Sequence, residues 1–137
     1  MGKMIRVKLT NVDIAVQSYQ NEIYFFDLKT AKQNAGEFKQ FKRNLLEWAA
    51  AYLADNPEAL INTCIAIPYN PYEPKPYARW TIRGMLDLDK ELYVAEGFWD
   101  LLGGEGTYLK LLDCFEEVGI ELRPEIDEYF LRFRHLV

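Results

Sequence analysis

Two aspartates and a lysine near the start of the chain have the types and spacing needed for phosphoryl chemistry. Asp27 and Lys29 lie in Glu22–Lys29, a segment rich in aromatic and β-branched residues, which is typical of a β-strand. Side chains two residues apart on a strand share a face. Asp13 directly precedes a short apolar run, Ile14–Val16. The two segments therefore predict a β-hairpin with both acids and the lysine near one end.

The length of the hairpin loop decides whether the two carboxylates meet. A three-residue loop, Tyr19–Asn21, with Asn21 in the left-handed region that asparagine tolerates, pairs Ser18 with Glu22. This register sets Asp13 directly opposite Asp27. Two adjacent carboxylates repel each other unless a cation lies between them. With Lys29 close by, the arrangement is typical of a site for a hard divalent metal, a water and a phosphate.

The same three residues also fit an ordinary surface ion pair. The chain has 21 acidic and 16 basic residues, so an acid followed two positions later by Lys or Arg is expected by chance roughly two or three times. Glu37–Lys39 and Glu73–Lys75 fit this pattern as well. Only Asp27–Lys29 ends a predicted strand whose hairpin partner begins with an acid.

The elements that position these residues can be read from hydrophobic spacing. A helix is predicted over 36–54 because its apolar residues recur at helical intervals. These are Phe38, Phe41, Leu45, Trp48 or Ala49, and Tyr52. Leu60–Pro68 is a nearly continuous apolar run, as expected of a buried parallel strand. A strand, a helix and a second strand in this order predict a right-handed crossover.

The remaining segments are shorter. We predict a first strand at Met1–Leu9, an extended loop at Tyr69–Tyr77, a short strand at Arg79–Met85, a turn at Asp87–Lys90, and helices over 97–102, 107–118 and 124–134, separated by Gly103-Gly104 and Gly119. The predicted fold is α/β (α+β), with a central mixed sheet, a β-hairpin, a crossover helix and C-terminal helices. We expect one domain, 1–137, with a core at 1–72 and a C-terminal extension at 73–137.

Composition narrows the classes of function. Half of the residues are hydrophobic and 15% are aromatic, which indicates a globular chain. It contains no apolar run of the roughly 18–20 residues that a membrane span needs. Two isolated cysteines, Cys64 and Cys114, and the single His135 argue against a Cys/His zinc site and a histidine-based triad. They also favour a reducing cytoplasm.

The net charge of −5 is unevenly distributed. Residues 1–54 hold eight Lys or Arg and five Asp or Glu, a balance of +3, whereas residues 55–137 hold eight basic and sixteen acidic residues, a balance of −8. The positive half carries the two aspartates. An acidic remainder is compatible with DNA binding if a basic surface faces the phosphates.

The order of strands and helix, with an acid opening one strand and D-x-K closing the next, resembles the PD-(D/E)xK nuclease core. In more detail the chain resembles the TdeIII-type family of type II restriction endonucleases. The segments that carry this resemblance are Val12–Val16, Phe26–Lys32 with Asn34, Phe41–Arg43, Leu45–Trp48, Ala66–Tyr72, Phe98–Asp100 and Gly103-Gly104. The chain departs from the superfamily pattern at Val12, where proline is usual, and at Asp27, where glutamate is common.

The resemblance implies a metal-dependent endonuclease, a homodimer, that cuts double-stranded DNA at a short sequence. In such an enzyme the core at 1–72 is expected to be catalytic, and the extension at 73–137 is expected to serve DNA recognition and dimerisation. Asp13, Asp27 and the Leu28 carbonyl are expected to bind Mg²⁺, with Mn²⁺ as a substitute. Lys29 is expected to orient the attacking water and to stabilise the developing charge on phosphorus. The residues expected to contact DNA phosphates are Lys32, Asn34, Lys39, Lys42 and Arg43.

Other interpretations remain open. Only twelve residues precede Asp13, which leaves no room for the helix that usually opens this core, so we expect the chain to correspond to a C-terminal portion of a longer relative. It would then be a non-catalytic fragment or remnant that binds DNA or dimerises. A third interpretation is a repair or junction-resolving nuclease of the same superfamily. Base readout has four weak candidates near the proline-rich loop: Asn70, Lys75, Arg79 and Arg83.

Overall fold

The computed structural model describes residues 8–82 and 84–134 of the chain, so the predicted strand Met1–Leu9 lies almost wholly outside the described residues. The chain divides into two compact units, Met1–Phe98 and Trp99–Val137. The first unit contains one four-stranded sheet in the order β1-β2-β3-β4. This mixed α/β architecture confirms the predicted fold class.

The predicted hairpin and its register are confirmed. β1 (Ile14–Gln17) pairs antiparallel with β2 (Ile23–Leu28), and Ile14 lies opposite Phe26. Asn21 has a φ of 62°, the left-handed conformation that the three-residue loop requires. The Ser18 N–H donates to the Glu22 carbonyl at 2.8 Å. The tight loop therefore fixes which residue of β1 meets which residue of β2.

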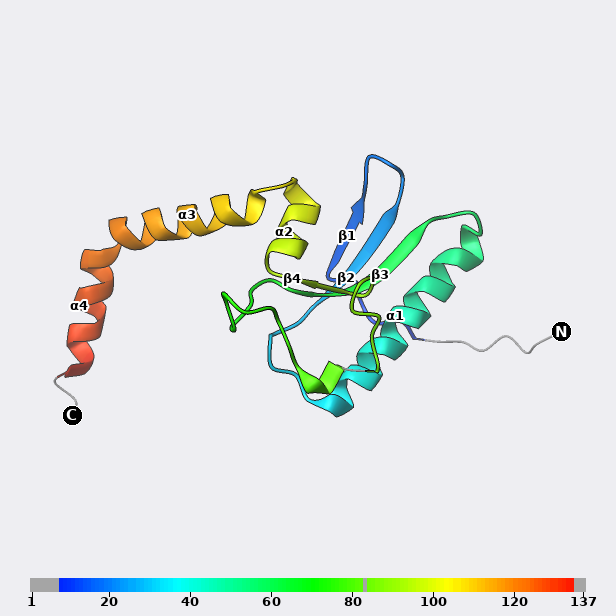
Figure 1. Cartoon of the computed structure of the whole chain (residues 1–137), viewed down its shortest axis with the longest axis horizontal. Coiled ribbons are helices and arrows are strands. Elements are labelled where there is room, and N and C mark those ends of the chain that lie inside the picture. The colour runs from blue at the N-terminus through cyan, green and yellow to red at the C-terminus, as the bar shows by residue number, and fades with distance from the viewer. Residues whose placement is uncertain (1–7, 83, 135–137) are drawn as a thin grey trace. The chain divides into compact units, whose positions relative to one another are not determined.

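The helix and strand that follow are also confirmed. α1 (Ala35–Asp55) begins after its N-cap residue Asn34, whose N–H donates to the Glu37 side chain at 2.7 Å. β3 (Ile61–Ile67) then pairs parallel with β2. Parallel neighbours need such a crossover, and Figure 1 shows α1 running beside the sheet.

The two faces of the sheet are covered differently. On one face Phe25 of β2 packs edge-on against Tyr52 of α1, with ring centroids 5.4 Å apart. The buried side chains of this core are Ala31, Phe38, Leu45, Trp48, Ile65, Ile67, Ile82 and Leu86. On the other face Phe26 packs against Phe98 at 5.4 Å and Tyr93 at 5.7 Å. Alternation along β2 thus places Asp27 and Lys29 on the α1 side.

One predicted element was wrong and another was missed. The predicted strand Arg79–Met85 is instead a short 3₁₀ helix, Trp80–Ile82, and Arg83 lies outside the described residues. The segment turns because the Ile82 N–H bonds back to the Arg79 carbonyl at 3.4 Å. β4 (Leu92–Val94) was not predicted, because three residues carry too little pattern. It pairs parallel with β3, after the confirmed turn at Asp87–Lys90.

The second unit is helical, as predicted. α2 (Glu96–Gly103) begins in the first unit and continues into the second, followed by α3 (Thr107–Glu121) and α4 (Arg123–Arg134). The predicted break at Gly119 is wrong, because α3 continues through that residue. A glycine in a helix costs only about 1 kcal/mol, and the break falls just before Pro124 instead. Across the described stretches, no helix combines the length and apolar character needed to cross a lipid bilayer.

Candidate functional site

The three residues singled out by the sequence meet at the end of β2. The regular ladder between β1 and β2 stops at the Ile14–Phe26 pair. Beyond it the Asp13 N–H donates to the Phe26 carbonyl at 3.1 Å, and the Leu28 N–H donates to Asp13 Oδ2 at 2.8 Å. The Asp13 carboxylate thereby takes the place of the next ladder acceptor, which holds it beside the end of β2.

Asp27 is the buried member of this group. Its exposed fraction is 6%, and Lys29 Nζ donates to its Oδ1 at 2.5 Å. Burial raises the pKa of the Asp27 carboxyl; Lys29 opposes that rise, and the charge and hydrogen bonding of Asp13 add to it. The two carboxylates are therefore close enough to influence each other, and Lys29 compensates part of their negative charge.

Lys29 is held from two sides. Its backbone N–H donates to the Ala66 carbonyl of β3 at 2.9 Å, and its Nζ lies 4.6 Å from the centre of the Phe41 ring on α1. A cation over an aromatic face is stabilised by the ring quadrupole. Phe41 was predicted only as a core residue, but it also orients the lysine toward Asp27.

The oxygen donors at this position suit a hard cation. Asp13 Oδ2 accepts the Leu28 N–H, and Asp27 Oδ1 accepts a hydrogen bond from Lys29 Nζ. Across residues 8–82 and 84–134, no cluster of three or more His, Cys, Asp or Glu side chains is placed to hold a metal. Mg²⁺ is commonly held by one or two carboxylates and several waters. Two carboxylates beside the partly exposed Leu28, whose carbonyl is the third predicted ligand, therefore fit magnesium in their chemistry.

The predicted DNA-contacting residues lie in different environments. Lys32, Asn34 and Lys39 are exposed, and Asn34 caps α1. Arg43 pairs with Glu47 on its own helix at 2.8 Å and stays largely exposed.

Lys42 differs from its neighbours because it already has a partner in the sheet. It donates to both oxygens of Glu91, to Oε2 at 2.6 Å, and Glu91 in turn accepts the Asp87 N–H at 2.8 Å. This ion pair ties α1 to the segment that leads into β4. The structure thus gives Lys42 a structural contact that the sequence did not reveal.

The loop between β2 and α1 is anchored by residues that sequence reasoning did not assign to the site. The Tyr77 hydroxyl donates to the Ala31 carbonyl at 2.8 Å. Arg79 and Thr81 both donate to the Gln33 carbonyl, at 3.0 and 3.3 Å. Of these residues, Tyr77 ends the run rich in proline and tyrosine, and Arg79 was only a weak candidate for base readout. They fix the loop that carries Lys32 immediately after the site.

Two candidates for base readout have structural contacts instead. Asn70 bonds within its own loop, where Nδ2 donates to the Lys75 carbonyl at 2.7 Å and Oδ1 accepts the Tyr72 N–H at 3.0 Å. Arg79 binds the loop before α1 as described, whereas Lys75 is exposed.

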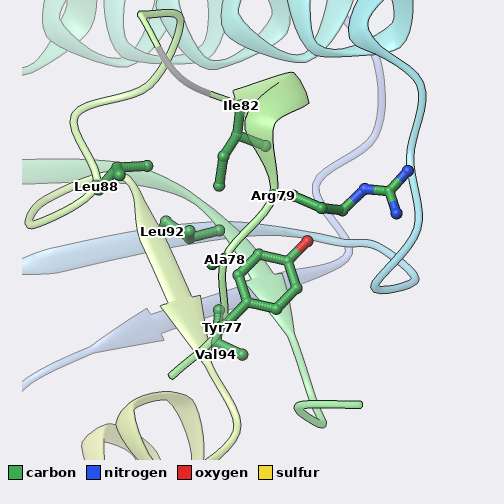
Figure 2. A pocket seen from close by; sticks show the side chains of 7 residues that line it. All are labelled: Tyr77, Ala78, Arg79, Ile82, Leu88, Leu92 and Val94. Atoms are coloured by element: carbon green, nitrogen blue, oxygen red, sulfur yellow. The ribbon is translucent and has the colours of Figure 1, made fainter. Parts of the chain in front are cut away.

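A pocket of about 330 Å³ lies beside β4 (Figure 2). It is lined by Tyr77, Ala78, Arg79, Ile82, Leu88, Leu92 and Val94. Figure 2 shows the Arg79 guanidinium extending away from the aliphatic lining toward the loop before α1. The predicted site residues are absent from its described lining. The pocket is therefore separate from the carboxylates.

The known proteins to which this chain is similar are described as type II restriction enzymes. The chain is similar to the type II restriction enzyme HgiCII of Herpetosiphon aurantiacus, with 26% identity over 125 residues that cover 90% of this chain and 45% of that enzyme. HgiEI from the same organism is 24% identical over 132 residues, which cover 94% of this chain and 47% of that enzyme. MjaII of Methanocaldococcus jannaschii is 27% identical over 122 residues, which cover 81% of this chain and 32% of that enzyme.

The chain thus spans about half the length, or less, of these curated relatives. Residues 1–119 match the family described as "Type II restriction endonuclease, HinfI". The matched range includes the two carboxylates, Lys29 and the whole sheet. This confirms the predicted class of restriction endonuclease, and the matching family is the HinfI family. The chain belongs to the HinfI family of type II restriction endonucleases.

Proposed function

We propose that this chain is the metal-dependent catalytic core of a type II site-specific deoxyribonuclease of the PD-(D/E)xK superfamily. It would hydrolyse phosphodiester bonds in double-stranded DNA. The observation that carries the proposal is the end of β2, where Asp13 and Asp27 are brought together beside Lys29 in a chain of a restriction endonuclease family. The finer TdeIII-type relationship stays a prediction.

Each residue has a role that follows from its position. Asp13, Asp27 and the Leu28 carbonyl would hold Mg²⁺, or Mn²⁺ in its place. The bound ion would polarise the scissile phosphate and lower the pKa of a water. Lys29 would orient the attacking water and stabilise charge that develops on the phosphate oxygens. Phe41 and Asp27 hold the lysine in place before substrate arrives, which favours preorganisation.

The DNA contacts belong to the same proposal. Lys32, Asn34, Lys39 and Arg43 lie after the site on the loop and on α1, where they would contact phosphates next to the scissile bond. Lys42 contributes less in this account because Glu91 already binds it. We also propose that residues 73–137 extend the core, and that the enzyme works in the cytoplasm.

Metal binding can be tested without any activity assay. Mg²⁺ or Mn²⁺ should raise the melting temperature of the unmodified chain, because a ligand that binds only the folded state stabilises it. The double variant Asp13→Asn, Asp27→Asn should lose this shift. A matched control, Asp55→Asn with Glu58→Gln, removes two exposed carboxylates elsewhere and should keep it. An equal shift in the site variant would show that the metal binds at another position.

A second candidate function follows from the length comparison. The relatives are about twice as long as this chain, so the chain could supply only the metal-binding part of an activity that needs further segments. Such a protein would bind metal and DNA but would not cut. Incubation of plasmid DNA with Mg²⁺, against the same mixture with EDTA, separates the two functions. The family match favours either of them over a repair or junction-resolving nuclease.

A further inference from the structure

Asp13 lies just beyond the regular part of the sheet. β1 is an edge strand, and its ladder with β2 stops at Ile14. The N–H and the carboxylate of Asp13 each hold it to β2 by a hydrogen bond. The end of an edge strand opens more readily than its centre, because fewer contacts hold it. The position of the Asp13 carboxylate therefore depends on how the residues before it are held.

Trp48 of α1 holds these residues. Its indole Nε1–H donates to the Thr10 carbonyl at 2.9 Å, three positions before Asp13. Trp48 is only 3% exposed, whereas Thr10 lies at the surface. Val12, between the two anchor points, packs against the same buried core as Trp48. The segment Thr10–Asp13 is thus tied to α1 at one end and to β2 at the other.

The same helix contacts the site at a second point. Phe41 precedes Trp48 by seven positions, which is two helical turns and about 10 Å along the axis, so both rings lie on one side of α1. Lys29 Nζ lies 4.6 Å from the centre of the Phe41 ring. Phe41 is itself held by the fully buried Phe38, with ring centroids 5.5 Å apart. One helix therefore supports both Lys29 and the segment before Asp13.

We propose that Trp48 is a positioning residue for the metal site, and that it acts on Asp13 through the Thr10 carbonyl. This inference rests on the proposed function, since it takes Asp13 as a metal ligand. The indole hydrogen bond keeps the end of β1 closed, and so keeps the Asp13 carboxylate beside Asp27 before an ion binds. A preorganised ligand binds more tightly because less conformational freedom is lost on binding. Trp48 itself is buried and acts only through the backbone.

A purely structural role for Trp48 leads to a different expectation. A buried indole N–H needs an acceptor in any case, and its loss would then lower the stability of the whole fold without changing metal affinity. Trp48→Phe keeps an aromatic ring in the core and removes only the donor and part of the ring. The Thr10 carbonyl is at the surface and can bond to water instead. Leu45→Val is the matched control, because Leu45 is fully buried in the same core, one turn earlier on α1.

Hydrogen exchange of the full chain tests the local part of this inference without metal. The Leu28 N–H donates to Asp13 Oδ2 at 2.8 Å, so its exchange reports on that carboxylate. In the unmodified chain the Trp48 indole hydrogen should be protected. In Trp48→Phe the Leu28 amide should exchange at least about tenfold faster, while the Lys29 amide, bonded to β3, stays protected. A freely exchanging Trp48 indole hydrogen, or an unchanged Leu28 amide in Trp48→Phe, would overturn the inference.

Calorimetric titration with Mn²⁺ in the absence of DNA tests the effect on the metal site. The double variant Asp13→Asn, Asp27→Asn gives the binding at other positions, which is subtracted. The unmodified chain and Leu45→Val should bind with the same affinity, whereas Trp48→Phe should bind about tenfold more weakly. Normal binding by Trp48→Phe, or equal weakening in Leu45→Val, would overturn this inference and leave the proposed function intact. Absence of site-specific binding by the unmodified chain would instead refute the proposed function, and this inference with it.

Discussion

At the residue scale, the site forms where the hydrogen-bond ladder between β1 and β2 ends. The β1–β2 ladder stops one pair before Asp13 and Asp27, and the Asp13 side chain then accepts the Leu28 N–H. Asp27 is buried, and Lys29 and Asp13 act on it in opposite directions. Two adjacent carboxylates beside Lys29 leave a negative centre that favours a cation.

The first prediction concerns Asp27 and pH. Burial raises the folded-state pKa of the Asp27 carboxyl. The protonated carboxyl therefore stabilises the folded chain fully below the unfolded-state pKa of about 3.9, and this stabilisation is lost as the pH rises through the folded-state pKa. In EDTA, Asp27→Asn should therefore become progressively more stable than the unmodified chain as pH rises through this window. Thermal melts at a series of pH values measure the difference. A variant that loses stability relative to the unmodified chain as pH rises would show that the Lys29 ion pair outweighs burial.

At the element scale, the parts that local pattern determines could be predicted. The loop length and Asn21 gave the register, and the helical spacing of Phe38, Leu45 and Trp48 gave α1. β4 has three residues and exists because β3 offers it an edge, so its own sequence did not reveal it. The 3₁₀ turn at Trp80–Ile82 likewise depends on distant contacts to Gln33.

The same reason explains which site contacts were missed. Lys42 and Glu91 are 49 positions apart in sequence, and no local period connects them. Tyr77 reaches Ala31 across a similar separation. The sequence thus predicted that the two acids and the lysine lie together, and it could not predict which residues support them.

The second prediction separates Lys42 from its neighbours. Lys42→Met should destabilise the chain by about 1 kcal/mol, because it leaves the half-buried Glu91 without its partner. It should change DNA affinity little. Lys39→Met on the exposed side of α1 should do the opposite, with stability almost unchanged and weaker DNA binding. Chemical unfolding and a fluorescence binding assay measure the two effects. An equal loss of DNA affinity in both variants would show that Lys42 also contacts DNA.

The third prediction concerns the start of α3. Asp100 accepts the Tyr108 N–H at 2.9 Å and the Gly106 N–H at 3.0 Å, and these bonds lower the pKa of its carboxyl. The ionised Asp100 carboxylate therefore stabilises the folded chain above about pH 3.9, and this stabilisation is lost as the pH falls through the lowered folded-state pKa. Asp100→Ala should speed exchange of the Tyr108 amide hydrogen at neutral pH. The control Asp113→Ala, in mid-helix, should not. Unchanged protection in Asp100→Ala would mean that other contacts hold this end.

At the scale of the whole molecule, the uneven distribution of charge along the sequence resembles the division of the structure into two units. The basic excess and the carboxylates fall in residues 1–54, within the unit that contains the sheet. The acidic excess falls later in the chain, which includes the helices α3 and α4, and these helices bury few of their own side chains. The sequence predicted the helices but not their exposure, because burial depends on what a helix packs against.

The comparisons with known proteins define how much of the chain matches the family. The HinfI family match covers residues 1–119, which includes all the proposed catalytic residues. The curated relatives are longer, and this chain spans about half of their length. A balance of only +3 on the site-bearing half predicts weak DNA binding whose affinity falls only gradually with salt, because few phosphates are neutralised.

Cleavage by the Lys29→Ala variant tests the central claim most directly. Plasmid DNA is incubated with Mg²⁺ and either the unmodified chain, Lys29→Ala, or the control Lys110→Ala, which removes an exposed lysine of α3 outside the proposed site. The unmodified chain and the control should cut, whereas Lys29→Ala should bind DNA but cut at least about 100-fold more slowly, since it lacks the charge that stabilises the transition state. Undiminished cleavage by Lys29→Ala would contradict the proposed site. Absence of cleavage by the unmodified chain would contradict its function as a complete nuclease.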